Sequence, residues 1–164
     1  MSFDAVLKHL RKGDFSLLDS VFDGPSIIEW HKQGRFDDHQ AELNEALSCA
    51  CFNGRCQVAE YLLHHGVRPE DGNLTGMNAI HWAANRGQLE AVRLLISRHA
   101  DLESVNTYLG TALSCAVWSA MNEPKPNHLE IVRTLIEAGA DRSTVEVPTG
   151  NPDIDRLLSP HNRP

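Results

Sequence analysis

The chain has 164 residues, of which 41% are hydrophobic and 23% charged, and these values are typical of one soluble domain. Its net charge of −7 argues against nucleic acid and anionic membranes as ligands, because both require clustered lysines and arginines. No run of about 20 apolar residues predicts a membrane span, and residues 1–14 contain no secretory signal. We therefore expect a cytoplasmic protein whose four cysteines, at positions 49, 51, 56 and 115, are reduced.

Residues 1–23 have the pattern of a helical cap. Apolar residues recur at helical spacing in two groups, and Gly13 separates the groups. The first group predicts an amphipathic helix and the second group a further helix: Phe3, Val6, Leu7 and Leu10, then Phe15, Leu17, Leu18 and Val21.

Residues 24–41 form an insertion that two local structures fit. The segment Ser26–Glu29 could be a capping box that opens a short helix ending before Gly34. The alternative is a hairpin turning at Gln33-Gly34. Trp30 and Phe36 would either pack on the first repeat unit or extend a binding surface.

An internal repeat organises residues 42–144. The segments EALSCA, NAIHWA and TALSCA begin at 45, 78 and 111, which gives a period of 33 residues. Each unit predicts two helices separated by a glycine in the left-handed conformation, Gly54 in the first unit and Gly87 in the second. Gly66, His99 and Gly139 occupy matching places after the second helices.

The three units span 42–74, 75–107 and 108–144. The third contains about seven inserted residues, and two closely spaced prolines predict a loop at 121–127. This loop would either lie on a binding side or be tolerated variation in length. After it, 145–159 predict a capping helix that opens with Asn151-Pro152 and buries Ile154, Leu157 and Leu158. We expect the tail, 160–164, to be disordered.

The segment 76–96, GMNAIHWAANRGQLEAVRLLI, resembles the ankyrin repeat, whose pattern has a period of 33 and a T-P-L-H-x-A core. Ala138–Asp141 and His99–Asp101 are similar to the G-A-D motif of that family. The resemblance implies an all-α solenoid of paired antiparallel helices with hairpin-like finger loops.

The chain departs from the family pattern in the core motif. Alanine replaces proline in all three units, and the histidine survives only as His81. In the family this histidine ties neighbouring fingers by hydrogen bonds. Ser48 and Ser114 stand in its place, and a short hydroxyl can bond locally, so we expect the outer units to be tied less firmly.

The resemblance also implies that partners bind on the concave face, formed by the fingers and the first helices. Carried across column by column, it assigns partner binding to the ends of the first helices and to two fingers: Phe52, Asn53, Asn85, Arg86, Trp118 and Ser119, and Leu74, Thr75, Met77, Thr107, Tyr108 and Gly110. Aromatic, methionine and arginine side chains are frequent interface anchors, which predicts an exposed aromatic stripe. The alternative is that Phe52 and Trp118 pack partly into the core, where we also expect Trp82.

No residue pattern predicts catalysis, a metal site or a cofactor. Cys49 and Cys51 point in different directions on one helix, and Asp37-Asp38-His39 is read as an N-cap run rather than an acid–base cluster. The sequence thus favours a non-catalytic monomer that binds one or more proteins. An inhibitor of a specific enzyme, an enzyme using the insertions and a homo-oligomer are the alternatives.

Overall fold

The computed structural model describes residues 1–24 and 26–159, and every regular element within them is a helix. This confirms the all-α class, while the predicted tail at 160–164 lies outside the described residues. In chain order the elements are α1 (Phe3–Lys12), η1 (Phe15–Leu18), α2 (Asp19–Phe22), α3 (Ser26–Lys32), α4 (Gln40–Phe52), α5 (Cys56–His64), α6 (Ala79–Arg86), α7 (Leu89–Ser97), α8 (Ala112–Asn122), α9 (His128–Glu137), η2 (Arg142–Thr144) and α10 (Pro152–Leu158).

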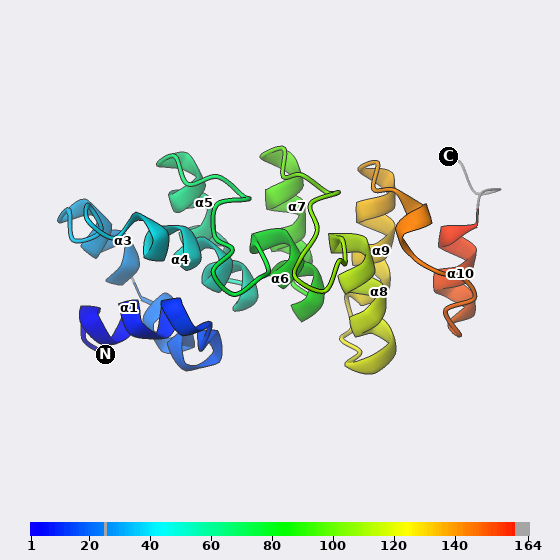
Figure 1. Ribbon diagram of the computed structural model, residues 1–164, viewed down its shortest axis with the longest axis horizontal. Helices are drawn as coiled ribbons and strands as arrows, with labels where there is room; N and C mark the ends of the chain where they lie inside the picture. Colours follow the sequence, from blue (N-terminus) through cyan, green and yellow to red (C-terminus); the bar gives the residue numbers. More distant parts are fainter. Residues whose placement is uncertain (25, 160–164) are drawn as a thin grey trace.

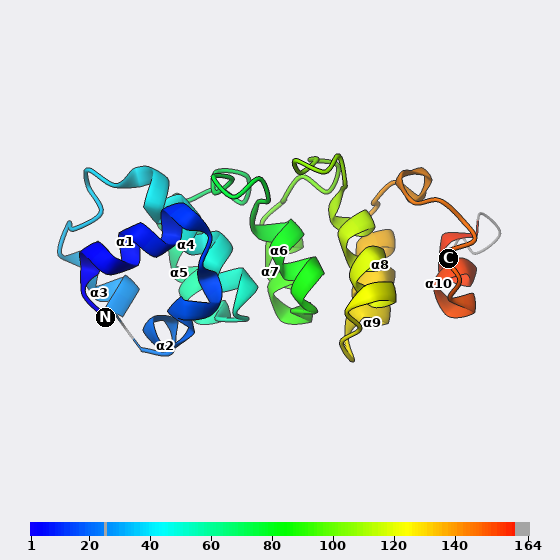
Figure 2. The same cartoon turned by 60° about the horizontal axis from the view of Figure 1, so that its bottom comes forward.

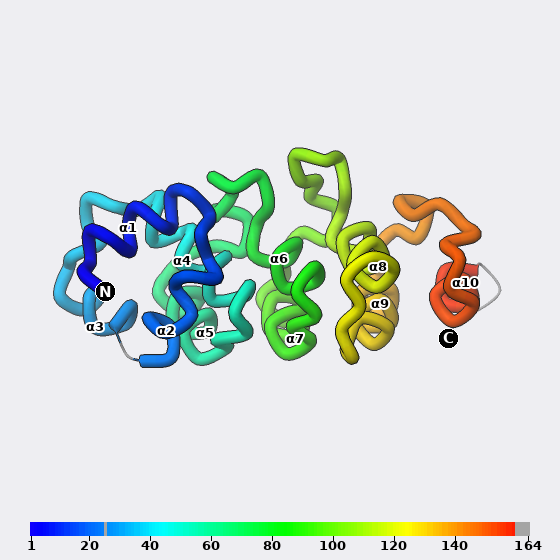
Figure 3. Tube along the Cα trace, turned by 90° about the horizontal axis from the view of Figure 1, so that it is seen from below, coloured from blue at the N-terminus to red at the C-terminus, as the bar shows by residue number. Residues whose placement is uncertain are grey.

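Helices α4 to α9 form three pairs, α4 with α5, α6 with α7 and α8 with α9, and these pairs stand side by side in one row (Figure 1). The first helices α4, α6 and α8 pack on one another as an inner row, and α5, α7 and α9 form the outer row behind them. The loops that join successive pairs project from the same edge (Figure 2). Helices α1 and α10 pack at the two ends, against α4 and α9 (Figure 3). Among the described helices, none combines the length and apolar character needed to cross a membrane.

The backbone confirms the predicted left-handed glycines at the ends of the first helices. Gly54 and Gly87 follow α4 and α6 with positive φ angles of 68° and 74°. His99 follows α7 at a φ of 60°, although it carries a side chain. A left-handed conformation is normally unfavourable for such a residue, so the repeat geometry imposes it there.

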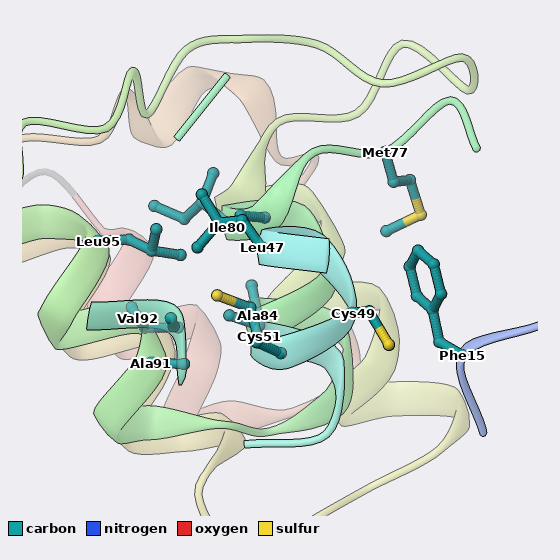
Figure 4. Packing of buried hydrophobic residues seen from close by; sticks show 14 of the residues in the cluster. Phe15, Leu47, Cys49, Cys51, Met77, Ile80, Ala84, Ala91, Val92 and Leu95 are labelled. Atoms are coloured by element: carbon teal, nitrogen blue, oxygen red, sulfur yellow. The ribbon is translucent and has the colours of Figure 1, made fainter. Parts of the chain in front are cut away.

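The core lies between the two rows of helices. Leu47, Ile80 and Leu95 are no more than 1% exposed and face one another across successive units (Figure 4). All four cysteines are free, and only Cys56 is not fully buried.

The N-terminal cap differs from the expectation at one position. Leu17 is 58% exposed, and Phe22 is buried in the cap instead. The reason is that Phe15–Leu18 forms a 3₁₀ turn, whose three-residue period turns Phe15 and Leu18 inward and Leu17 outward.

The insertion contains the predicted helix rather than the hairpin. Ser26 is the first residue of α3. Phe36 is buried against Phe3 of α1, with ring centroids 5.0 Å apart, and the half-buried Trp30 contacts the same ring at 5.3 Å. Both aromatic residues therefore pack inward on the cap helix rather than extend a binding surface, and α3 itself packs on α5 of the first unit.

The polar run 37–39 precedes α4 as expected, and His39 is the N-cap residue, but its side chain makes no capping hydrogen bond.

Neighbouring fingers are tied in all three units. His81 Nε2 donates to the carbonyl oxygen of Ser104 at 2.9 Å, and burial lowers the pKa of this imidazole, which keeps it neutral. Ser48 Oγ donates to the Gly72 carbonyl at 2.8 Å, and Ser114 Oγ donates to the Thr144 carbonyl at 3.0 Å. The two serines thus bond over 24 and 30 residues as the histidine does, rather than locally, because the backbone comes close enough for a short hydroxyl to reach it.

Gly72 makes the approach to Ser48 possible. A Cβ atom placed on Gly72 would lie 2.3 Å from the carbonyl oxygen of Asn44 and 2.8 Å from Ser48 Oγ. We therefore expect Gly72→Ala to lower the free energy of unfolding by about 1–3 kcal/mol through overpacking, measured by urea denaturation. Gly24→Ala is the control, since a Cβ there meets no atom within 4 Å. Equal stabilities of the two variants would contradict the account.

The C-terminal helix begins as predicted. Asn151 Oδ1 accepts from the N–H groups of Asp153 and Ile154, and Pro152 occupies the first turn. In the third unit, α8 continues to Asn122, so Met121 and Asn122 are helical. The inserted loop is correspondingly shorter than predicted, 123–127 rather than 121–127.

Candidate functional site

A groove of about 570 Å³ lies on the finger side of the second and third units. Its lining comes from the two fingers and from the inner helices α6 and α8: Met77, Asn85, Asn106, Tyr108, Gly110, Ser114, Cys115 and Trp118. Protein sites for ligands commonly have volumes of this order, with apolar walls and a few polar groups.

The outer wall of the groove is the turn at residues 106–110, the finger loop of the third unit, and hydrogen bonds hold it in shape. Asn106 Oδ1 accepts from the N–H groups of Tyr108 at 2.9 Å and Gly110 at 3.0 Å. Leu109 has a φ of 62°, a conformation that costs a non-glycine residue about 1 kcal/mol. Tyr108 and Leu109 are 84% and 83% exposed, so the turn holds two large apolar side chains in solvent.

Hydrogen bonds fix the side chains of the inner wall. Asn85 Nδ2 of α6 donates to Ser119 Oγ of α8 at 2.8 Å, and Asn106 Nδ2 donates to Cys115 Sγ at 3.2 Å. Trp118 stands beside this wall and remains 54% exposed. Burial raises the pKa of the Cys115 thiol to about 11, so the thiol is neutral near pH 7 and is not a reactive thiolate.

Within the described ranges, no three His, Cys, Asp or Glu side chains are placed to hold a metal ion. Asp37 and Asp38 are exposed and do not line the groove.

Comparison with known protein families shows which family the repeats belong to. The family model "Ankyrin repeats (3 copies)" matches residues 47–145, more than half of the chain. The chain belongs to the ankyrin repeat family. Such modules typically mediate protein–protein interactions and are usually non-catalytic.

The individual relatives are much longer proteins. The chain is 29% identical to mouse protein fem-1 homolog A-like over 61% of its own length and 15% of that protein. It is 34% identical to zebrafish inversin over 50% of the chain and 7% of that relative. For the ANK repeat-containing protein nipk-1 of Caenorhabditis elegans, the identity is 32%, over 63% of the chain and 18% of the relative. The chain therefore spans less than a fifth of each of these relatives.

The ankyrin groove brings together five of the residues that the sequence assigned to partner binding: Met77, Asn85, Tyr108, Gly110 and Trp118. Met77 is only 8% exposed, so it forms a floor rather than an exposed anchor. Leu74 and Thr107 are exposed on the fingers outside the groove, and the Thr107 N–H donates to the Gly76 carbonyl.

Several other assigned residues have structural contacts. Ser119 is fully buried, and Asn53 Nδ2 donates to the carbonyl oxygens of Phe15 and Cys49. Thr75 Oγ1 accepts from the indole N–H of Trp82 at 3.1 Å, and Trp82 is half-buried rather than fully in the core.

Phe52 is also half-buried, because it lies edge-on to the rings of Phe15 and Trp82. Arg86 lies over the Phe52 ring, 4.6 Å from its centroid. Phe52 therefore packs partly into the core, as the alternative interpretation expected. The predicted stripe of exposed aromatic residues consequently does not extend to the first unit.

Sequence reasoning missed Asn106, Ser114 and Cys115. Their positions carried a usable signal, since Ser114 and Cys115 precede Trp118 by four and three residues and so share its helix face. Asn106 precedes an exposed Thr-Tyr-Leu-Gly turn, where asparagine commonly bonds the backbone two residues ahead.

Proposed function

We propose that the chain is a single domain that binds a partner protein and catalyses no reaction. The partner would bind in the groove between Tyr108 and Trp118. The observation that carries this proposal is the pair of exposed aromatic side chains on rigid supports beside an apolar groove. Aromatic anchors that lose little conformational freedom on binding are the usual centres of protein interfaces.

Apolar exposure around the groove supports the same surface. Large exposed apolar residues occur on both fingers and on α8: Leu74, Tyr108, Leu109, Trp118 and Met121. A surface of this kind is typical of interaction sites, whereas single scattered apolar residues are normal anywhere on a protein.

The proposal includes a monomer in a reducing compartment such as the cytoplasm, with protein rather than nucleic acid or membrane as the ligand. Four free cysteines, three of them buried, fit such a compartment. The net charge of −7 fits a protein partner better than a polyanion.

Affinity capture with matched variants tests the proposal. Tyr108→Ala combined with Trp118→Ala should weaken partner binding about thirty-fold or more, because two interface anchors are lost. The melting temperature should stay near that of the wild type, since both side chains are mostly exposed. Capture followed by mass spectrometry and binding measurements on the recovered protein gives the result.

Leu17→Ala is the matched control, since Leu17 is 58% exposed on the cap, away from the groove. It should retain the partner in full. If the double variant recovers the same protein with the same affinity, the groove is not the binding site.

A further inference from the structure

Two cations lie near the end of α6, close in the fold to the groove residue Asn85. Arg86 directly follows the groove residue Asn85, and its guanidinium stacks over the Phe52 ring. Lys125 lies over the glycine that ends α6, because a Cβ atom on Gly87 would be 2.8 Å from Lys125 Cβ. The two cations thus come from different repeats, and both lie close enough to His128 to act on its imidazole.

His128 holds the inserted loop in this place. Its Nδ1 accepts from the Lys125 N–H at 3.0 Å, and its Nε2 donates to the Asn85 carbonyl oxygen at 3.1 Å. Burial lowers the pKa of His128, and the charges of Lys125 and Arg86 lower it further, as expected for two cations near one imidazole. The insertion therefore carries a lysine to the inner helices beside the groove.

Neither cation has a carboxylate partner within the part of the chain that the structure describes. Arginines 55, 68, 93 and 98 each pair with an Asp or Glu, whereas Arg86 and Lys125 do not. Glu123 lies in the same loop and is exposed, but it forms no ion pair with either of them. In a chain with a net charge of −7, two cations that form no ion pair with a described carboxylate leave a local positive charge near Asn85.

We propose that the groove takes a linear acidic segment of a partner protein. A bulky apolar side chain of that segment fills the space between Tyr108 and Trp118, and neighbouring Asp or Glu side chains pair with Arg86 and Lys125. Arg86 follows the groove residue Asn85 in the chain, and Lys125 packs over Gly87. The carboxylates of an extended segment, which advances about 3.3 Å per residue, should therefore lie within a few residues of its apolar anchor. This inference rests on the proposed function, because it uses the same groove.

Synthetic peptides test the inference directly. The probes are fluorescein-labelled peptides of about ten residues with a central Leu or Phe, flanked by Asp/Glu, by Ser/Gln or by Lys/Arg, with binding followed by fluorescence anisotropy. The acidic set should bind the wild type about tenfold more tightly than the basic set, and its affinity should fall as salt is added.

Charge reversal gives the sharper result. Arg86→Glu combined with Lys125→Glu should reverse the preference towards the basic set. Arg86→Gln with Lys125→Gln should remove the preference without reversing it, which keeps the test valid if the reversed chain folds poorly. The control, Lys8→Glu with Lys12→Glu, makes the same change in net charge on exposed positions of α1 and should keep the acidic preference.

Equal binding of acidic and neutral peptides, or an unchanged preference after charge reversal, would overturn the inference. Absence of binding by all three peptide sets would overturn it as well, while capture that depends on Tyr108 and Trp118 would leave the proposed function standing. Capture that does not depend on those two residues would defeat the proposed function instead.

Discussion

Replacing Phe15 by alanine is expected to lower the free energy of unfolding by about 3–5 kcal/mol, as for other buried aromatic residues. Phe15 is 1% exposed, and its ring lies edge-on to Phe52 of α4 at 5.7 Å and to Trp82 of α6 at 5.6 Å. The ring therefore joins the cap to two successive repeats, and its removal would leave a cavity at their common boundary. Urea denaturation monitored by circular dichroism measures the effect.

Leu17→Ala provides the comparison, because it removes an exposed side chain from the same 3₁₀ turn. Its effect should stay within about 0.5 kcal/mol. If Phe15→Ala were equally mild, the cap would not be packed into the repeats in the way described.

Glu45→Gln is expected to change how stability depends on pH. Glu45 is fully buried in α4, one carboxylate oxygen accepts from the Leu74 N–H, and the other oxygen has no hydrogen-bond partner. Burial raises the pKa of this carboxyl from 4.5 to about 7, against the smaller effect of the Leu74 hydrogen bond. In the same column of the other units, Asn78 and Thr111 cap their helices.

The raised pKa of Glu45 determines whether stability rises or falls with pH. Below pH 4.5 Glu45 is protonated in both the folded and the unfolded chain, so it does not affect the balance. Between pH 4.5 and about 7 the unfolded chain loses this proton first, and the wild type loses stability as the pH rises. A shift of this size corresponds to about 3 kcal/mol.

The stability difference between Glu45→Gln and the wild type isolates the effect. Burial lowers the pKa values of His31, His81 and His128, and these groups make stability rise with pH in both proteins alike. The difference should therefore shift in favour of Gln by about 3 kcal/mol between pH 4.5 and about pH 8. A difference that is constant over this range would show that Glu45 ionises normally.

The repeat architecture could be predicted because its determinants are local and periodic. The 33-residue spacing, the glycines after α4 and α6, and the Asn151-Pro152 start of α10 each specify backbone geometry within a few residues. Even the left-handed conformation of His99 followed from its alignment with Gly66 and Gly139.

The exposure of single side chains could not be predicted in the same way, because it depends on distant contacts. Phe52 occupies a column expected to face a partner, yet the cap places Phe15 against it. The column of Ser119 was likewise expected to be exposed, but Asn85 of the preceding repeat covers it. The place of Lys125 likewise depends on a distant contact, because His128 bonds both the Lys125 N–H and the Asn85 carbonyl oxygen of the preceding repeat.

Photo-crosslinking from α8, the helix that carries Trp118, tests the central claim most directly. Met121 is 40% exposed and lies one helical turn beyond Trp118, so it can be replaced by p-benzoylphenylalanine without removing a proposed anchor. We expect irradiation of Met121→p-benzoylphenylalanine in cell extract to give a discrete crosslink to one partner, and the crosslink to disappear when Tyr108 and Trp118 are also changed to alanine. Crosslinks of the same pattern from p-benzoylphenylalanine at position 17, or a Met121 crosslink that survives the two alanine changes, would contradict the claim.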